Sequence, residues 1–465
     1  MSDKVSKIPD WLVPACFAFY LILNIVSWQF PFFWDSLLTS TICTWFFDNG
    51  WLNGIPPEQI DAGHPPLFYG YIFTWWKFLG RNLSTSHLAM LPFLWVMIYQ
   101  FIQICDRLLK NTNQVIAAAI LFCLETTIIA QSTMVSYDIV ILAFYLFGLR
   151  YLLDNKNIPV AIAGIVLALI SLRGAFAFGA LFFTELLLFF NKDRRFKSIL
   201  LKYFPAFLIF VVWNIYHYKI SGWMLFTPSE QWADQRGLAG IKGSFKNVLV
   251  IIRNLLEPGR VLLYFIIFVG LILKWRFLKD KHLKTILVIT IVPLLIFSAL
   301  FVPFNNPIGH RYLMIIFALS ILLFISLIEQ FKFKTIWIVG TALMLISGHF
   351  WYSYYPANLS KGWDASLEHI AYFKARKKMW NYCDEHNIPI SETSAKFPLD
   401  VSMNQSNLNN DERRPNKFSG NNKYVFVSPL NNNYETSELD TIQANYDLLK
   451  EVKNREIDIE LWRVK

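Results

Sequence analysis

The chain has 465 residues, of which 55% are hydrophobic, 17% aromatic and only 16% charged. Soluble domains carry roughly a quarter charged residues, so this composition indicates a polytopic membrane protein. The net charge of +10 does not indicate a nucleic-acid partner, because residues 1–352 hold 28 Lys and Arg against 17 Asp and Glu, while the remainder is nearly balanced. The basic excess therefore belongs to loops that orient membrane spans. The five cysteines lack paired spacing and support neither a disulfide framework nor a Cys-based metal site.

Apolar segments long enough to cross roughly 30 Å of hydrocarbon recur from Trp11 to about Tyr352. Basic residues fall in alternate loops between these segments, and the positive-inside rule assigns those loops to the cytoplasm. The pattern predicts a cytoplasmic N-terminus and a C-terminal tail on the outer side. The eleven predicted spans cover residues 11–33, 88–106, 114–131, 136–153, 158–172, 175–191, 199–218, 260–276, 285–303, 312–329 and 335–352.

The stretch 158–191 has two interpretations. Arg173-Gly174 is either a tight outer turn between two spans or a kink in one tilted helix. Two spans are favoured, because a single span would place the basic residues at 192–197 outside and invert every later loop.

Two predicted outer loops, residues 34–87 and 219–259, are long enough to suggest a functional role. In the first, Pro65-Pro66 suits the start of a helix and Gly80 suits its end. The helix between them, 67–79, is short and rich in Trp and Tyr, which is typical of a helix lying along the membrane interface.

Residues 353–465 predict a small soluble α/β domain, in addition to a membrane domain over 1–352. A helix is expected over 364–385 and an Asn-rich loop over 404–422. Strands are expected at 424–427 and 457–462, the second with alternating apolar residues.

Three aspartates are candidate catalytic residues on the outer side. Asp35 follows Phe32-Phe33-Trp34 at the end of the first span, where a carboxylate at the boundary of lipid and water suits a general base, or simply marks a helix end. Asp138 opens the fourth span and is either functional or an N-cap. Asp61 precedes a helix, a position where Asp is common. Deeper carboxylates, Glu125 and Glu185, are better explained by pairing with polar neighbours.

Four basic residues are candidate phosphate ligands. His64 precedes two prolines and suits a phosphate, a metal or a capping role. Arg311, with His310 beside it, lies just outside the tenth span and suits bidentate binding of a phosphate, or contact with lipid headgroups. Arg173 has structural pairing as its alternative. These residues and the aspartates come from different segments, yet the predicted topology places all of them on the outer side.

The Phe32-Phe33-Trp34-Asp35-Ser36 segment, His64-Pro65-Pro66-Leu67, Asp138 and Arg311-Tyr312 together resemble the GT-C superfamily. These integral-membrane glycosyltransferases use polyprenyl-phosphate sugars as donors. The resemblance covers residues 11 to about 352 and is closest to the branch with protein O-mannosyltransferases and the aminoarabinose transferase.

The resemblance implies a GT-C-like fold and specific roles. Asp35 would be the catalytic base or a metal-linked carboxylate, Asp138 the second acidic residue, and His64 and Arg311 the ligands of the donor phosphate. A divalent cation, Mg²⁺ or Mn²⁺, would use Asp35 and Asp138. Ser36 stands where the family often has a second acidic residue, which leaves metal use open.

The implied activity is transfer of a sugar, with inversion, to a lipid, glycan or protein hydroxyl on the outer face of a bacterial inner membrane. The partners would be the polyprenyl-phosphate-sugar donor and membrane lipids. A lipid-linked oligosaccharide polymerase or ligase is an alternative, against which the early His-Pro-Pro motif argues. A transporter or flippase is another, although paired hydropathy halves are not apparent. A scaffold whose tail recruits partners is the third.

Overall fold

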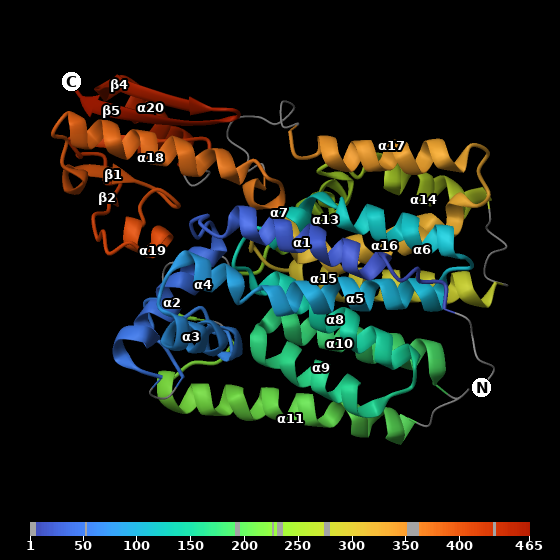
Figure 1. Ribbon diagram of the computed structural model, residues 1–465. Helices are drawn as coiled ribbons and strands as arrows, with labels where there is room; N and C mark the ends of the chain where they lie inside the picture. The colour runs from blue at the N-terminus through green and yellow to red at the C-terminus, as the bar shows by residue number, and fades with distance from the viewer. Residues whose placement is uncertain are drawn as a thin grey trace.

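The computed structural model describes residues 6–51, 54–190, 196–225, 227–229, 236–273, 280–350, 362–430 and 434–465. A body of helices extends to residue 350, and a small α/β domain follows from residue 362. In Figure 1 this domain lies at one end of the body, with its short helix α19 beside α2, and the described chain begins toward the opposite end. The predicted boundary at 352/353 falls outside the described residues.

The helices of the body follow the order of the apolar segments, with short helices between them. They are α1 (Leu12–Ser27), α2 (Asp35–Asn49), α3 (Leu67–Leu79), α4 (Leu83–Leu88), α5 (Leu91–Leu108), α6 (Thr112–Cys123), α7 (Thr126–Ser132), α8 (Tyr137–Leu153), α9 (Asn157–Ile170), α10 (Leu172–Phe189), α11 (Phe196–Ser221), α13 (Gly240–Leu256), α14 (Val261–Leu273), α15 (Lys281–Phe301), η3 (His310–Leu313), α16 (Met314–Ile328) and α17 (Lys334–Ser347).

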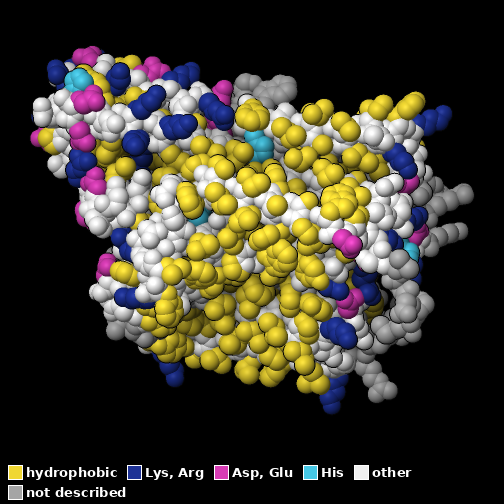
Figure 2. All heavy atoms as spheres, in the orientation of Figure 1, with side chains coloured by type: hydrophobic (Ala, Val, Ile, Leu, Met, Phe, Trp, Pro, Cys, Tyr) yellow, Lys and Arg dark blue, Asp and Glu magenta, His cyan; other side chains and the backbone are white. Residues whose placement is uncertain are grey.

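The centre and the rim of the body differ in exposure. Nearly all of α16 is buried, so this helix forms the core, whereas α11 exposes apolar side chains such as Leu201, Phe204 and Phe207. Figure 2 shows hydrophobic side chains covering the middle of the face, with charged side chains gathered on the C-terminal domain and at the opposite edge. A broad apolar belt of this kind suits lipid contact, and the chain is an α-helical integral membrane protein.

Five helical segments among the described residues are long and apolar enough to cross a membrane, or seven if each of two bent pairs is one span. The segment predicted at 114–131 is one bent pair, because α6 and α7 meet at 58°. Glu125 lies at this break, caps α7 by accepting from the Ile128 N–H, and forms an ion pair with Arg260. The eleven predicted spans therefore include several helices shorter than a full crossing, such as α1, α9 and α17.

The 158–191 stretch forms two helices, as favoured, but the break is at Ser171. The Ser171 side chain caps α10 by accepting from the Gly174 N–H, so Arg173 and Gly174 belong to the first turn of α10 and do not form the turn itself. In the same region Glu185 of α10 is fully buried and pairs with Lys202 of α11 at 2.5 Å. Its other oxygen accepts from the Tyr203 hydroxyl at 2.9 Å, in agreement with the pairing expected for deep carboxylates.

The long loop 34–87 is largely helical. The helix expected at 67–79 is present with these bounds, preceded by Pro66 and ended by Gly80, whose φ of 90° suits glycine. Sequence analysis missed α2, so the position predicted for Asp35 was wrong: α1 ends at Ser27, and Asp35 is the first residue of α2.

The C-terminal domain is a five-stranded sheet in the order β2-β1-β3-β5-β4. The two pairings of β1 are parallel and the other two are antiparallel. The predicted strands at 424–427 and 457–462 are β3 and β5, and the predicted helix is shorter than expected, beginning at residue 369. Its elements are η4 (Trp363–Ala365), α18 (His369–Glu385), η5 (Ile390–Glu392), β1 (Thr393–Ala395), α19 (Met403–Asn407), β2 (Asn416–Lys417), β3 (Tyr424–Val427), α20 (Thr436–Asn445), β4 (Tyr446–Asn454) and β5 (Ile457–Val464).

Contacts between the two parts fix the C-terminal domain on the helical body. Arg81 donates to Asn404 at 2.9 Å, and Gln405 donates to Thr41 of α2 at 3.2 Å. The His369 ring stacks on Phe33, two residues before α2, with ring centroids 5.7 Å apart. The C-terminal domain therefore packs directly against the segment that carries Asp35.

Candidate functional site

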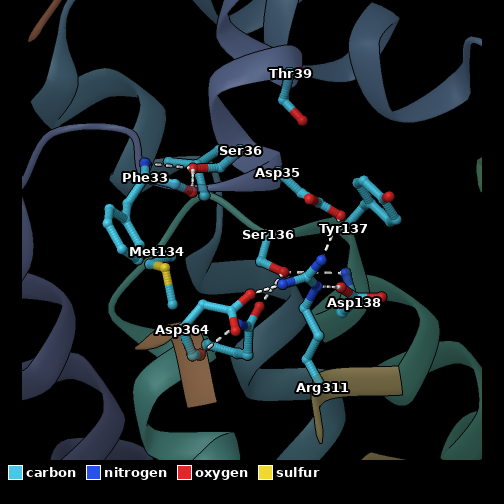
Figure 3. Close-up of a pocket in the computed structure, with 12 residues that line it drawn as sticks. Phe33, Asp35, Ser36, Thr39, Met134, Ser136, Tyr137, Asp138, Arg311 and Asp364 are labelled. Atoms are coloured by element: carbon cyan, nitrogen blue, oxygen red, sulfur yellow. Dashed lines mark hydrogen bonds and ion pairs between the residues drawn. The ribbon is translucent and has the colours of Figure 1, made fainter. Parts of the chain in front are cut away.

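Five charged side chains from five separate elements meet at the end of the body where the C-terminal domain sits. They are Asp35 at the start of α2, Asp138 in the first turn of α8, Arg173 in the first turn of α10, Arg311 in η3 and Asp364 in η4. Figure 3 shows Asp35, Asp138 and Asp364 arranged around the Arg311 guanidinium. We call these five residues the charged cluster.

Asp138 is a buried carboxylate that pairs with both arginines of the cluster. Its Oδ1 lies 2.8 Å from Arg173 Nη1 and its Oδ2 lies 3.3 Å from Arg311 Nε. The side chain is only 6% exposed, so both oxygens are committed to arginines away from water. The N-cap alternative for Asp138 is wrong, because Ser136 is the N-cap of α8. Asp138 thus holds the two guanidinium groups beside one another.

Arg311 contacts a different carboxylate with each nitrogen of its guanidinium. Nη2 lies 2.5 Å from Asp35 Oδ2, Nε faces Asp138, and Nη1 pairs with Asp364 Oδ2. The guanidinium also lies 4.8 Å from the Tyr312 ring, and that of Arg173 lies 3.9 Å from the same ring. Arginine is well suited to hold an oxyanion in this planar geometry.

Asp35 is the accessible carboxylate of the cluster. Its side chain is 41% exposed, against 6% for Asp138 and for Asp364. Trp34, just before it, has a φ of 55°, a left-handed conformation that is rare for a bulky residue. The Trp34 ring packs edge-on against Phe397 of the C-terminal domain, with centroids 5.3 Å apart. Contacts across the two parts thus support the turn that presents Asp35.

Two hollows share the Asp138–Arg311 pair in their linings. One encloses about 260 Å³, including its open mouth, and most of the residues that line it are polar, among them Asp35, Ser36, Thr39, Gln131 and Ser136. The other encloses about 240 Å³. It combines the two arginines with an apolar wall, formed by Ile141, Leu142, Phe297, Met314 and Ile315. We call these the polar pocket and the apolar pocket.

His64 lies beside the cluster and not within it. Its ring is 5.8 Å from the Tyr137 ring, and Tyr137 accepts a 2.5 Å hydrogen bond from Arg173. Among the described residues, the buried Nδ1 of His64 has no hydrogen-bond partner. Burial and the positive charges of Arg173 and Arg236 lower the pKa of His64 to about 3. The ring is therefore neutral at physiological pH and offers a single N–H to a ligand.

Asp61 pairs with residues outside the charged cluster. Its Oδ2 lies 2.9 Å from His217 Nε2, and its Oδ1 accepts from the Gly63 N–H at 2.8 Å. This arrangement ties the loop that carries His64 to the end of α11, which makes Asp61 a support for that loop.

The His310 ring packs against Gly362 of the C-terminal domain. A Cβ added to Gly362 would lie 2.5 Å from His310 Nδ1, and Gly362 has a φ of 63°, so only glycine fits there. His310 thus packs against the turn that leads to Asp364.

Among the described residues, no group of three His, Cys, Asp or Glu side chains has the geometry to hold a metal ion. Both oxygens of Asp138 and one of Asp35 face guanidinium groups. The cluster as it stands is therefore an arginine–carboxylate arrangement and does not fit the divalent cation considered from sequence.

Sequence analysis missed Asp364. It was predicted as the first residue of a helix over 364–385, whereas Asp364 lies in η4, before that helix begins, and both Trp363 and Asp364 are buried. The Gln131 side chain donates to the Asp364 carbonyl at 2.8 Å, which fixes this turn to α7. The sequence offered one signal: a Trp, a residue that is usually buried, stands next to an acidic residue in the segment that follows the last predicted span.

No protein-family model matches the chain, and no curated protein matches its sequence. The fold, however, matches solved structures over nearly the whole chain. ArnT from Cupriavidus metallidurans bound to undecaprenyl phosphate is 10% identical, with 97% of each chain covered and a TM-score of 0.51. The apo state of the same protein has the same identity and coverage and a TM-score of 0.50. The fold expected from the GT-C resemblance is thus confirmed.

Proposed function

We propose that the chain is a membrane glycosyltransferase that transfers a sugar from a polyprenyl-phosphate donor to a hydroxyl acceptor at the outer face of the membrane. The observation that carries the proposal is that Arg173 and Arg311 both line the apolar pocket, while Arg311 also lines the polar pocket beside the accessible Asp35 carboxylate. The fold shared with a protein whose structure was solved with undecaprenyl phosphate supports the same substrate class.

The two pockets suit the two ends of such a donor. The apolar wall of Ile141, Phe297 and Met314 suits the first isoprene units of the lipid. The guanidinium groups of Arg173 and Arg311 suit the phosphate, because Arg binds oxyanions through several N–H groups at once. The sugar would then lie in the polar pocket beside Asp35.

Chemistry at this site follows from exposure and charge. Asp35 accepts the proton of the acceptor hydroxyl as its oxygen attacks the anomeric carbon, and the bond from that carbon to the phosphate oxygen breaks. Arg173 and Arg311 stabilise the negative charge that develops on the leaving phosphate. Neutral His64 donates one hydrogen bond to the same phosphate. Asp138 serves as a positioning residue for both arginines, and Asp61 supports the His64 loop.

The proposal places the C-terminal domain in the periplasm of a bacterial inner membrane and the N-terminus in the cytoplasm. Its support is the positive-inside distribution of the basic loops, together with the ion pair that joins Asp364 of the C-terminal domain to Arg311 of the charged cluster. Attack from the polar pocket, opposite the phosphate, would invert the anomeric carbon.

The test is transfer by the purified full-length chain in liposomes, with radiolabelled undecaprenyl-phosphate sugars and a panel of lipid, glycan and peptide hydroxyl acceptors. Asp35→Asn is expected to lower the rate by about 10²- to 10⁴-fold, the usual contribution of a general base. Asp48→Asn is the matched control, because Asp48 is an exposed carboxylate near the other end of α2. Transfer by Asp35→Asn at the wild-type rate would contradict the assignment.

The same liposomes separate the competing functions. Movement of the labelled lipid across the bilayer without transfer would favour a flippase. Use of a pyrophosphate-linked glycan as donor in place of the monophosphate sugar would favour a polymerase or ligase.

A further inference from the structure

The carboxylate of Asp364 occupies the edge of Arg311 that a donor phosphate would need. Arg311 Nη1 pairs with Asp364, while Nε and Nη2 face Asp138 and Asp35. All three nitrogens of the guanidinium therefore already face carboxylates. A phosphate that approaches the Nη1 edge of Arg311 therefore competes with the Asp364 carboxylate for the N–H groups there.

The three carboxylates are not equally replaceable. Asp138 also pairs with Arg173 through its second oxygen, so its displacement would break two contacts. Asp35 is required nearby as the proposed base. Among the described residues, Asp364 forms an ion pair with Arg311 and with no other basic side chain, and its side chain is 6% exposed at the wall of the polar pocket. Asp364 is thus the carboxylate whose replacement leaves the remainder of the cluster intact.

Charge balance points to the same residue. The cluster holds three carboxylates against two guanidinium groups, and Arg236, which interacts electrostatically with Arg173, adds a third positive charge beside them. An incoming phosphodiester adds another negative charge to a largely buried site, where unbalanced charge is strongly disfavoured. The cost falls when the Asp364 carboxylate leaves Arg311.

The backbone around Asp364 supports a movement of the side chain alone. The Gln131 side chain holds the Asp364 carbonyl at 2.8 Å, the Trp363 side chain is 1% exposed, and the Ala365 N–H donates to the Gly362 carbonyl at 2.8 Å. These contacts hold the turn in place on α7. The carboxylate can therefore leave and return by rotation about its own side-chain bonds.

We propose that Asp364 is a built-in competitor for the donor phosphate on Arg311, a positioning residue supplied to the site by the C-terminal domain. This inference rests on the proposed function, because it concerns the phosphate of the same donor. Asp364 neutralises Arg311 when the site is empty, yields it to the donor, and returns as the lipid phosphate product leaves. The residue lowers affinity for phosphate and speeds product release.

The experiment measures binding of undecaprenyl phosphate to the purified full-length chain in nanodiscs, for the wild type and for Asp364→Asn. The variant is expected to bind about 10-fold more tightly, because a charged hydrogen-bond competitor on Arg311 has been removed. In the transfer assay it is expected to lower both the donor KM and kcat, since the product leaves more slowly. A merely structural role would weaken binding instead.

Asp384→Asn is the matched control, because it removes another carboxylate of the C-terminal domain that pairs with an arginine, Arg413, but on the exposed surface. It is expected to bind as the wild type does. Asp364→Glu, which keeps the negative charge, is expected to bind undecaprenyl phosphate with an affinity close to that of the wild type. Asp364→Ser repeats the test with a smaller uncharged side chain, should the Asn variant not fold.

Equal or weaker binding by folded Asp364→Asn or Asp364→Ser would overturn the inference while leaving the proposed function in place. Failure of the wild type to bind undecaprenyl phosphate better than undecaprenol, the same lipid without phosphate, would overturn both together. Tighter binding by the uncharged variants, with unchanged binding by Asp384→Asn, supports the competition.

Discussion

Removing the charge of Asp138 tests whether this residue holds the two arginines in place. The carboxylate lies 2.8 Å from Arg173 and 3.3 Å from Arg311, and it is 6% exposed. At an effective dielectric constant near 20, each attraction is about 5 to 6 kcal/mol before desolvation is subtracted. Breaking one side of a buried ion pair has a net cost of about 3 to 5 kcal/mol, which is the loss expected for Asp138→Asn.

The measurement is equilibrium unfolding of the full-length chain in mixed micelles. Asp154→Asn is the matched control, because Asp154 ends the same helix and also pairs with two arginines, Arg107 and Arg150. The Asp154 and Arg107 side chains are 20% and 43% exposed, so this change is expected to cost less than about 1 kcal/mol. The transfer rate of Asp138→Asn is expected to fall at least 10-fold, because the phosphate ligands lose their alignment.

A double-mutant cycle identifies the cause of the loss. If Asp138 acts through Arg173, the variant Asp138→Asn with Arg173→Gln is expected to be more stable than the sum of the single effects by about 0.5 to 3 kcal/mol. Single effects that add to within about 0.5 kcal/mol, or an Asp138→Asn variant as stable as Asp154→Asn, would refute the reasoning.

Two further predictions concern groups outside the cluster. Burial lowers the pKa of His369 to about 4, so below pH 6.5 the unfolded chain binds a proton that the folded chain does not. The free energy of unfolding that is attributable to His369 is therefore expected to fall by about 1.4 kcal/mol per pH unit as the pH falls from 6.5 to 4. Thermal unfolding at pH 7, 6 and 5 measures this slope, and His369→Phe is expected to flatten it. An unchanged slope would contradict the assignment. Lys202→Met removes the ion pair between the buried Glu185 and Lys202, at an expected cost of about 3 to 5 kcal/mol. Adding Glu185→Gln should recover most of that loss, and a double variant as unstable as the single one would argue against a dominant role for charge.

Local sequence signals predicted several elements well. The helix 67–79 has strong punctuation, a proline pair before it and a glycine after it, and the structure reproduces its bounds. Asp138 and Arg311 were placed on the same side by loop charge alone, and the structure brings them into contact. These inferences succeeded because membrane topology reduces the arrangement in space to a choice between two sides.

The positions of three other carboxylates depended on tertiary contacts that the sequence pattern does not reveal. Asp35 was assigned to the end of a first span that in fact ends eight residues earlier, because the aromatic residues before it belong to a packed turn and not to a helix. Asp61 was grouped with the catalytic candidates, yet its contacts are with His217 and Gly63. Asp364 was overlooked because its role depends on a domain folding back over residues that lie more than 300 positions earlier in the chain.

That folding back has a consequence for the timing of biosynthesis. A ribosome completes α2 and α8 long before it reaches the turn at Gly362 to Ala365 and the packing of Phe397 on Trp34. Until residues 362–465 are synthesised and folded, Trp34, the left-handed residue before Asp35, lacks its contact with Phe397, and Arg311 lacks its ion pair with Asp364. A nascent or truncated copy would therefore carry Asp35, the base of the proposed reaction, without the packing that presents it.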